Sequence, residues 1–315
     1  MGTLDPDVAR LIASIEAMFP VPPPDVTADQ RRAGYRAAFA ELLHPPPLAP
    51  FEGDVLDRGM ETEVGEVPVR TYRPVTAQPG GDVVVLLPGG GWVIGDLETG
   101  DPTARALATG MDLTVITVDQ RKAPEHPFPA GFDDALGVVQ AVSERLQPRW
   151  LGVAGDSSGG NLAAGVALAC ALSGRQCDAQ LLIYPALDPA MATPSHRALA
   201  TGHLLERDVM RYYWASYLGE APADDARVTP AAAGDDALAG VAPAVVATAE
   251  FDPLHDEGRG YAQRLLGLGV PTCHLPGPGL VHGWVDHVEL VPAALAARDR
   301  AIAVFDALRP PQSRA

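Results

Sequence analysis

The feature that most constrains this chain is a series of short apolar runs that alternate with longer helical stretches. The runs are rich in β-branched residues and read DVVVLL, LTVITVD, WLGVAGD, AQLLIYP and PAVVATAE. Between them lie stretches such as GFDDALGVVQAVSERL and GGNLAAGVALACAL. Such runs are typical of strands buried on both faces, and their alternation with helices predicts a mainly parallel sheet. We therefore predict an α/β protein.

Two regions depart from this alternation. Residues 1–50 carry two helical patterns, DPDVARLIASIEAMF and TADQRRAGYRAAFAELL, and a proline-rich run closes each of them. After LLIYPALDP the chain runs through SHRALATGHLLERDVMRYYWASYLG before the next strand at about residue 243, which is a far longer connection than usual. We expect residues 1–50 and an insertion at about 190–225 to form a helical cap on a catalytic domain of residues 51–315. Ligands bind at the carboxyl edge of such sheets, so a cap there would cover the site.

Composition argues against several classes of partner. The chain has 23 Lys and Arg against 40 Asp and Glu, a net charge of −17, and so lacks a basic surface for nucleic acid. No apolar run reaches the roughly 18 residues that a membrane span requires. Cys170, Cys177 and Cys273 are widely spaced and odd in number, which predicts reduced thiols. Together with an N-terminus that lacks an apolar signal segment, they predict a cytoplasmic protein.

The sharpest functional signal is the stretch VAGDSSGGNLAAG. Gly155 to Gly159 fit the pattern G-x-S-x-G between a predicted strand and a helix of small residues, which is the context of a nucleophile elbow. Small residues at both ends of the pattern permit a tight turn that exposes the central hydroxyl. The alternative is an idle serine in a glycine-rich turn. The context favours Ser157 as a nucleophile.

A serine hydroxyl needs a base to take its proton and a third group to orient that base. Asp252 follows a predicted strand directly in EFDPLHDEG and is the expected acid. Asp256 is the alternative acid, although it also fits the first turn of the following helix, where a carboxylate is favoured. His282 lies in the glycine-rich loop LPGPGLVHGW and is the expected base. The remaining nearby histidines are predicted to be structural: His255, His274 and His287.

Several dispersed motifs together resemble the hormone-sensitive-lipase-like (family IV) esterases of the α/β-hydrolase superfamily. They are PGGGW, APEHPFPAGFDDA, GDSSGGN, EFDPLHDEG and LVHGW, and the resemblance runs from about residue 50 to the end. It implies a mostly parallel eight-stranded sheet flanked by helices, with the N-terminal helices as part of a cap. It also implies that the backbone amides of Gly90, Gly91 and Ser158 form an oxyanion hole.

The chain departs from that family at three places. Pro88 stands where the family usually has histidine, and Ser158 stands where it usually has alanine. Gln120, Arg121 and Lys122 replace the usual Tyr-Arg-Leu. None of these changes removes a member of the expected triad or an oxyanion amide. They do bear on how the glycine loop is positioned and on which substrate is preferred.

Aromatic residues of the cap segment MRYYWASYL are candidates for a substrate pocket. They could instead pack the cap onto the body of the protein. The candidate pocket residues are Trp92, His203, Tyr213 and Trp214.

We expect a serine carboxylesterase that acts on short- to medium-chain esters of small molecules through an acyl-enzyme. The alternatives are a deacetylase or amide hydrolase for one metabolite and a non-catalytic small-molecule binder of the same fold. We expect no cofactor, because Ile94 occupies the last glycine position of a G-x-G-x-x-G pattern. No metal is expected either, since His282, Asp286 and His287 lack further ligands at suitable spacing. The oligomeric state stays open, a homodimer included.

Overall fold

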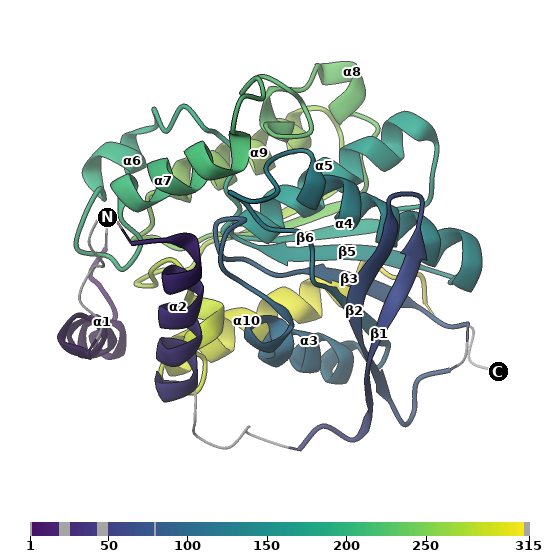
Figure 1. The fold of residues 1–315 in the computed structure, drawn as a ribbon, viewed down its shortest axis with the longest axis horizontal. Coiled ribbons are helices and arrows are strands. Elements are labelled where there is room, and N and C mark those ends of the chain that lie inside the picture. Colours follow the sequence, from purple (N-terminus) through teal and green to yellow (C-terminus); the bar gives the residue numbers. More distant parts are fainter. Residues whose placement is uncertain (1, 19–25, 43–49, 79, 312–315) are drawn as a thin grey trace.

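One eight-stranded sheet forms the centre of the protein (Figure 1). The computed structural model describes residues 2–18, 26–42, 50–78 and 80–311. The strand order is β1-β2-β4-β3-β5-β6-β7-β8, with β1, β2 and β4 paired antiparallel and the other neighbours parallel. The predicted mostly parallel, eight-stranded α/β sheet is thus confirmed. The strands are β1 Gly53–Thr62, β2 Gly65–Pro74, β3 Val83–Leu87, β4 Thr114–Val118, β5 Leu151–Asp156, β6 Ala179–Ile183, β7 Ala244–Ala247 and β8 Thr272–Leu275.

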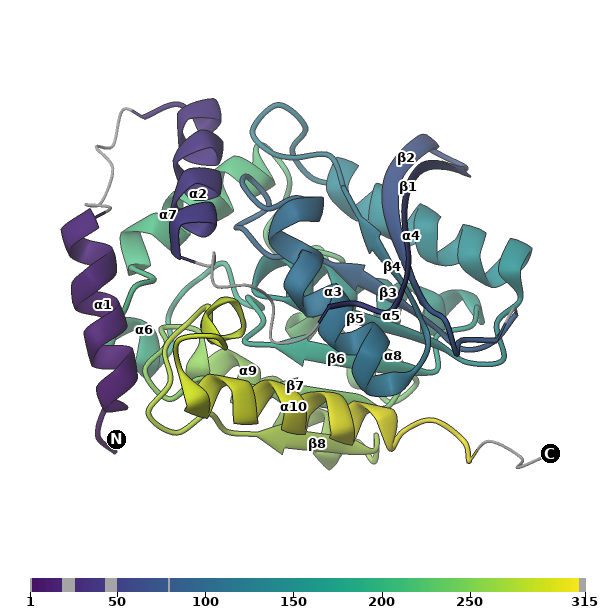
Figure 2. The same ribbon diagram turned by 90° about the horizontal axis from the view of Figure 1, so that it is seen from below.

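Helices cover both faces of the sheet, as Figures 1 and 2 show. Strand β3 is buried along its whole length, and alternate residues join two separate cores. Val85 and Leu87 belong to a core that also contains residues of α4 (Ala130–Ala141), α5 (Ser158–Ser173) and α9 (His255–Gly267). Val84 and Leu86 belong to a second core, which contains residues of α3 (Leu97–Met111) and α10 (Pro292–Asp306). Burial on both faces explains why the central strands are continuous β-branched runs.

Four helices lie together at one end of the sheet (Figures 1 and 2). Two come from the N-terminal region, α1 (Pro6–Met18) and α2 (Ala28–Leu42), close to their expected positions. The other two come from the long insertion, α6 (Pro194–Ala198) and α7 (Arg207–Leu218). Much of the rest of the insertion lacks regular helix. The remaining short elements are η1 Val142–Leu146, η2 Pro230–Ala232, α8 Asp235–Leu238 and η3 Trp284–His287.

Among the described helices, none has both the length and the apolar character needed to cross a bilayer. Cys170, Cys177 and Cys273 are all free thiols. Burial raises the pKa of the Cys170 thiol to about 11, so this side chain acts as a small apolar group in the core.

Candidate active site

Ser157 occupies a sharp turn between the end of β5 and the first residue of α5. Its backbone angles are φ 53° and ψ −118°, a region that an L-residue rarely adopts. The turn is possible only because glycine surrounds it. A Cβ on Gly159 would lie 1.9 Å from the carbonyl oxygen of Leu87. The backbone N–H of Ser157 donates to the carbonyl of Ile183 at 2.8 Å, which ties the turn to the neighbouring strand β6.

The structure brings the three expected triad residues into one hydrogen-bonded relay. The hydroxyl oxygen of Ser157 lies 2.9 Å from Nε2 of His282, and Nδ1 of His282 lies 2.8 Å from Oδ2 of Asp252. Asp252 is fully buried, and its second oxygen accepts the N–H of Leu254 at 2.9 Å. The Tyr184 ring lies 4.6 Å from the His282 ring and packs against it.

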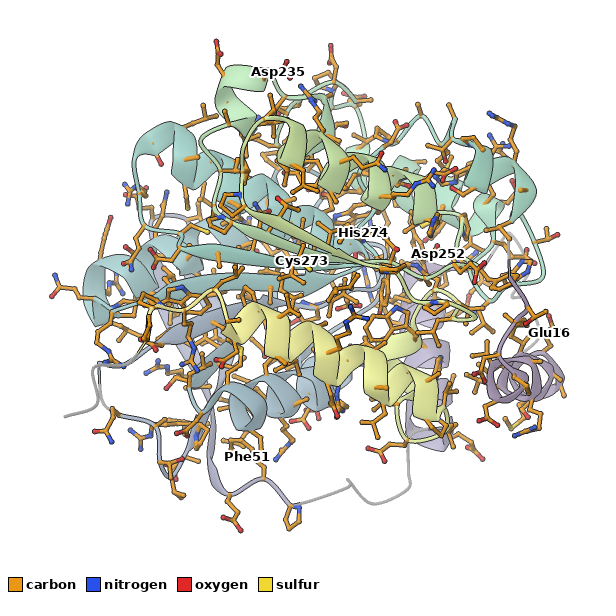
Figure 3. The ribbon with its side chains drawn as sticks, turned by 180° about the vertical axis from the view of Figure 1, so that it is seen from behind. Glu16, Phe51, Asp235, Asp252, Cys273 and His274 are labelled. Atoms are coloured by element: carbon orange, nitrogen blue, oxygen red, sulfur yellow. The ribbon has the colours of Figure 1, made fainter. Side chains whose placement is uncertain are left out.

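Two loops carry the acid and the base, and backbone pairing holds them side by side. Phe251 and Val281 form an isolated parallel bridge, each one residue before its functional side chain. The N–H of Phe251 donates to Leu280 at 2.9 Å. Figure 3 shows Asp252 beyond the ends of the strands, toward α1, while Cys273 and His274 lie on β8. The expected strand before Asp252 ends earlier, at Ala247.

The glycine loop after β3 lies against this relay. Gly90 and Gly91 have φ angles of 116° and 59°, and both residues border the cavity that contains Ser157. The carbonyl of Gly90 accepts the N–H groups of Val93 and Ile94 at 3.1 and 2.8 Å. Within the described residues, no protein group accepts the N–H of Gly90 or of Gly91. These two amides are therefore free to donate to a ligand beside the serine.

Other contacts anchor this loop where the related family uses a histidine at position 88. The N–H of Gly89 donates to Oδ1 of Asp156 at 2.8 Å, which links the loop to the residue before Ser157. The side-chain amide of Gln120 donates to the carbonyl of Pro88 at 3.3 Å. Thus Gln120, one of the departures from the family pattern, has a structural partner in this loop.

A cavity of about 370 Å³ opens above the relay, and residues of α1, α2 and α7 border it on the side away from the sheet. Its size is in the range of small-molecule sites, and its walls are mainly apolar. The sheet side contributes Gly90, Gly91, Asp156, Ser157 and His282. The helical side contributes residues that the sequence did not single out as a site, because they come from separate elements: Ile15, Arg31, Tyr35, Ala38, Phe39, Leu204, Leu205, Glu206 and Val209.

Of the four candidate pocket residues, Tyr213 borders this cavity. Trp92, His203 and Trp214 do not border it. Trp92 stacks on Tyr217 at 4.4 Å between ring centroids and lies 4.3 Å from the ring of Trp214. These aromatic rings pack α7 against the body of the protein. This is the alternative to a role in the substrate pocket that the sequence left open. His203 stacks on Phe251 at 5.6 Å.

Three titratable side chains line the cavity close to the relay. Burial raises the pKa of Asp156 to about 6, against the opposing effects of the Gly89 N–H and His282. Burial and the nearby charge of Asp156 raise the pKa of Asp286 well above its usual range. Burial also lowers the pKa of His287 to about 4. His287 is therefore neutral at pH 7, and the raised pKa of Asp286 favours its protonated form.

The alternative acid and the other histidines have structural partners. Asp256 accepts the N–H of Ser195 at 2.9 Å and pairs with Arg259, so it fastens α6 to α9 rather than facing His282. His255 contacts the carbonyl of Ala249 at 2.7 Å, and Nε2 of His274 lies 3.0 Å from the hydroxyl of Thr248.

Next to Asp256, Glu257 adds a second anchor for α6. It pairs with the fully buried His196 at 2.9 Å, and burial raises the pKa of Glu257 to about 7. Sequence reasoning gave no signal for this pair. Among the described side chains, no group of three or more His, Cys, Asp or Glu residues is placed to hold a metal ion.

Comparisons with known proteins cover nearly the whole chain. The sequence profile of the alpha/beta hydrolase fold family matches residues 84–286. Carboxylesterase NlhH of Mycobacterium tuberculosis is 38% identical over 309 residues, 95% of this chain and 96% of the relative. Ethyl acetate hydrolase of Pseudomonas putida is 33% identical, covering 90% of this chain and 92% of the relative.

Solved structures agree with the sequence comparisons. A thermostable esterase from Pseudomonas putida has a TM-score of 0.90 at 29% identity, covering 98% of both chains. A hyperthermophilic esterase from Pyrobaculum calidifontis has a TM-score of 0.89 at 29% identity, covering 97% of this chain and 99% of that one.

Proposed function

Because the chain belongs to the α/β-hydrolase fold family, in its hormone-sensitive-lipase-like branch, we propose that it is a carboxylesterase that uses Ser157, His282 and Asp252. The relatives are ester hydrolases by name, which favours ester over amide cleavage and catalysis over ligand binding alone. The observation that carries the assignment of residues is the continuous hydrogen-bonded relay from Ser157 through His282 to the buried Asp252.

The reaction follows from the order of these three side chains in the relay. The hydroxyl oxygen of Ser157 attacks the ester carbonyl carbon while Nε2 of His282 takes the hydroxyl proton. Asp252 accepts a hydrogen bond from the Nδ1–H of His282. It thereby holds the ring in the tautomer that leaves Nε2 free, and it stabilises the imidazolium that forms.

The tetrahedral intermediate carries its negative charge on the former carbonyl oxygen. We assign the stabilisation of this charge to the N–H groups of Gly90, Gly91 and Ser158. Gly90 and Gly91 border the cavity, and no described protein group accepts their N–H groups. Ser158 is the first residue of α5, where the first N–H groups have no partner within the helix. The alcohol then leaves with the proton from His282.

Deacylation repeats these steps with water. His282 takes a proton from the water as the water oxygen attacks the acyl carbon. His282 then returns this proton to the Ser157 oxygen while the bond between that oxygen and the acyl carbon breaks, which releases the carboxylic acid and restores the hydroxyl. An apolar cavity of about 370 Å³ suits short- to medium-chain acyl and alcohol groups. The helices that border the cavity act as the cap, formed by residues 1–50 and the insertion near 190–225.

We also propose a cytoplasmic location, since three free thiols suit a reducing compartment. Fractionation of cells that express the protein tests this point separately from activity.

The test of function combines a substrate panel with covalent labelling. Hydrolysis of p-nitrophenyl esters from acetate to dodecanoate should peak at short to medium chains. A stoichiometric organophosphate should label Ser157 and abolish hydrolysis, because only a serine with an adjacent base reacts readily. Label on another residue, or near-normal activity of Ser157→Ala, would contradict the assignment.

A further inference from the structure

Arg32 of helix α2 forms hydrogen bonds with the backbone that holds the glycine loop. The Nε of Arg32 donates to the carbonyl of Val93 at 2.8 Å, and its Nη2 donates to the carbonyl of Ala123 at 3.0 Å. Val93 is fully buried, and its own N–H closes the turn on Gly90 at 3.1 Å. Because the N–H of Ala123 also donates to Trp92 at 2.9 Å, Arg32 joins both segments that hold this turn.

The same side chain has a second kind of contact at its outer end. Arg32 forms an ion pair with Glu125 at 2.6 Å, and it lowers the pKa of that half-exposed carboxyl to about 2. Asp29, one turn earlier on α2, pairs with Arg32 at 2.8 Å. The arginine is thus fixed by two carboxylates while it donates inward to two carbonyl groups.

The two faces of α2 serve different parts of the site. Arg31, Tyr35 and Phe39 follow one another at intervals of four residues and border the substrate cavity. Arg32 and Arg36, also four residues apart, face the loop, and Arg36 pairs with Asp96 at 2.6 Å at the start of α3. One helix therefore contacts both the expected substrate and the loop that carries Gly90 and Gly91.

Apolar burial contributes little to holding α2 in place. Among its described side chains, only Ala28 is buried. Charge-assisted hydrogen bonds to carbonyl groups are stronger than neutral ones and depend strongly on direction. The position of α2 relative to the loop therefore depends mainly on its arginine contacts.

We propose that Arg32 is a positioning residue for the oxyanion hole, acting through the carbonyl of Val93. The proposal rests on the function assigned above to Gly90 and Gly91. Arg32 touches no reacting atom; it fixes the turn from Gly90 to Val93, so the two amides point into the cavity without needing a histidine at position 88. Helix α2 is then part of the catalytic machinery as well as a cover for the substrate.

The test compares Arg32→Ala with Glu125→Gln, which removes the ion pair but leaves both inward hydrogen bonds. Loss of one oxyanion donor costs roughly 10²–10³ in rate, and a displaced loop should lose part of that amount. We expect Arg32→Ala to lower kcat by about 10- to 100-fold with KM changed less than about threefold. Glu125→Gln should stay within about twofold of wild type in kcat.

A second readout separates positioning from general loosening of the fold. The affinity for an alkyl trifluoromethyl ketone, which forms a tetrahedral adduct on serine, should fall in Arg32→Ala by the same factor as kcat/KM. Arg32→Lys, with a point charge in place of the forked donor, should recover only part of the loss. If Arg32→Ala does not fold, as judged by circular dichroism, Arg32→Lys replaces it in the test. Arg32→Lys should then show a smaller loss of kcat and of inhibitor affinity, again with little change in KM.

Three outcomes would overturn the proposal. Equal losses in Arg32→Ala and Glu125→Gln would reduce the contact to an ion pair that anchors α2. A raised KM with unchanged kcat in Arg32→Ala would assign Arg32 to substrate binding. Unchanged kcat and KM in Arg32→Ala would show that Arg32 does not position the oxyanion hole. Failure of the proposed function itself is recognised separately, since Ser157→Ala would then keep its activity whatever Arg32 does.

Discussion

Gly91 offers a direct test of how the glycine loop and α7 fit together. Its φ of 59° is left-handed, and a Cβ built there would lie 2.2 Å from Cγ of Tyr213 and within 2.5 Å of two further ring atoms. Ordinary carbon contacts are about 3.5–4.0 Å, so Gly91→Ala must separate the loop and the ring by more than about 1 Å. An alanine in the left-handed region adds about 1–2 kcal/mol of backbone strain.

The size of the effect follows from what a shift of that length does to an oxyanion hole. Donors act at about 2.7–3.1 Å, and loss of one costs about 2.7–4 kcal/mol, or roughly 10²–10³ in rate. We expect Gly91→Ala to lower kcat/KM for p-nitrophenyl butyrate by about 100-fold. Adding Tyr213→Ala removes the obstructing ring, so the double variant should recover at least about tenfold over Gly91→Ala alone.

The matched control is Gly90→Ala, whose Cβ would lie 2.5 Å from the backbone nitrogen of Gly95. Removal of the Tyr213 ring cannot relieve a backbone contact, so Tyr213→Ala should not rescue Gly90→Ala. Steady-state kinetics of the three single variants and both double variants, each checked for folding by circular dichroism, make the comparison. Equal rescue of both glycine variants, or near-wild-type activity of Gly91→Ala, would refute this account of the loop.

Two further predictions concern the acid and the pH dependence of stability. Asp252→Asn should lower kcat by orders of magnitude, about 10⁴ in the chymotrypsin template. Asp256→Asn should change kcat less than about tenfold, because the partners of Asp256 are Ser195 and Arg259. If stopped-flow assays show a larger loss of kcat for Asp256→Asn than for Asp252→Asn, Asp256 is the catalytic acid. Burial lowers the pKa of His287 from 6.5 to about 4. Between these two pH values the folded state binds fewer protons than the unfolded state, so the free energy of unfolding falls as the pH drops from 6.5 to 4, by up to about 3 kcal/mol. Urea unfolding at pH 7.5 and pH 4 should show a smaller difference for His287→Leu than for wild type, and an equal difference would contradict the burial argument.

The order of functional residues along the chain could be predicted because each carries a local signal. Ser157 has glycines around it that only a tight turn requires, and Asp252 and His282 each follow a predicted strand in loop sequence. The isolated bridge between Phe251 and Val281 has no such signal, because it joins two loops far apart in sequence. That bridge nevertheless sets the spacing of acid and base.

The cavity walls could not be predicted in the same way. An aromatic ring suits a core position as well as a pocket position, so the sequence does not distinguish the two roles for Trp92 and Trp214. The packing of their rings against each other and against Tyr217 assigns both to the core. Strand β1 could not be predicted from its own sequence either. Its sequence GDVLDRGMET is mostly exposed and polar, so it lacks the apolar alternation of a half-buried strand and exists because it pairs along its whole length with β2.

Pro88 shows how a departure from the family pattern can leave the chemistry intact. A histidine at this position would contribute side-chain hydrogen bonds, whereas proline contributes a fixed φ and no N–H. The loop that follows is instead held from three directions: Asp156 takes the Gly89 N–H, Gln120 donates to the Pro88 carbonyl, and Arg32 donates to Val93. The Asp156 contact has a cost, because burial raises the pKa of that carboxyl to about 6 and so disfavours the ionised form that accepts best. A partly buried carboxylate beside the strained Ser157 is therefore best explained by function, since it joins the turn that carries the nucleophile directly to the loop that carries the proposed oxyanion donors.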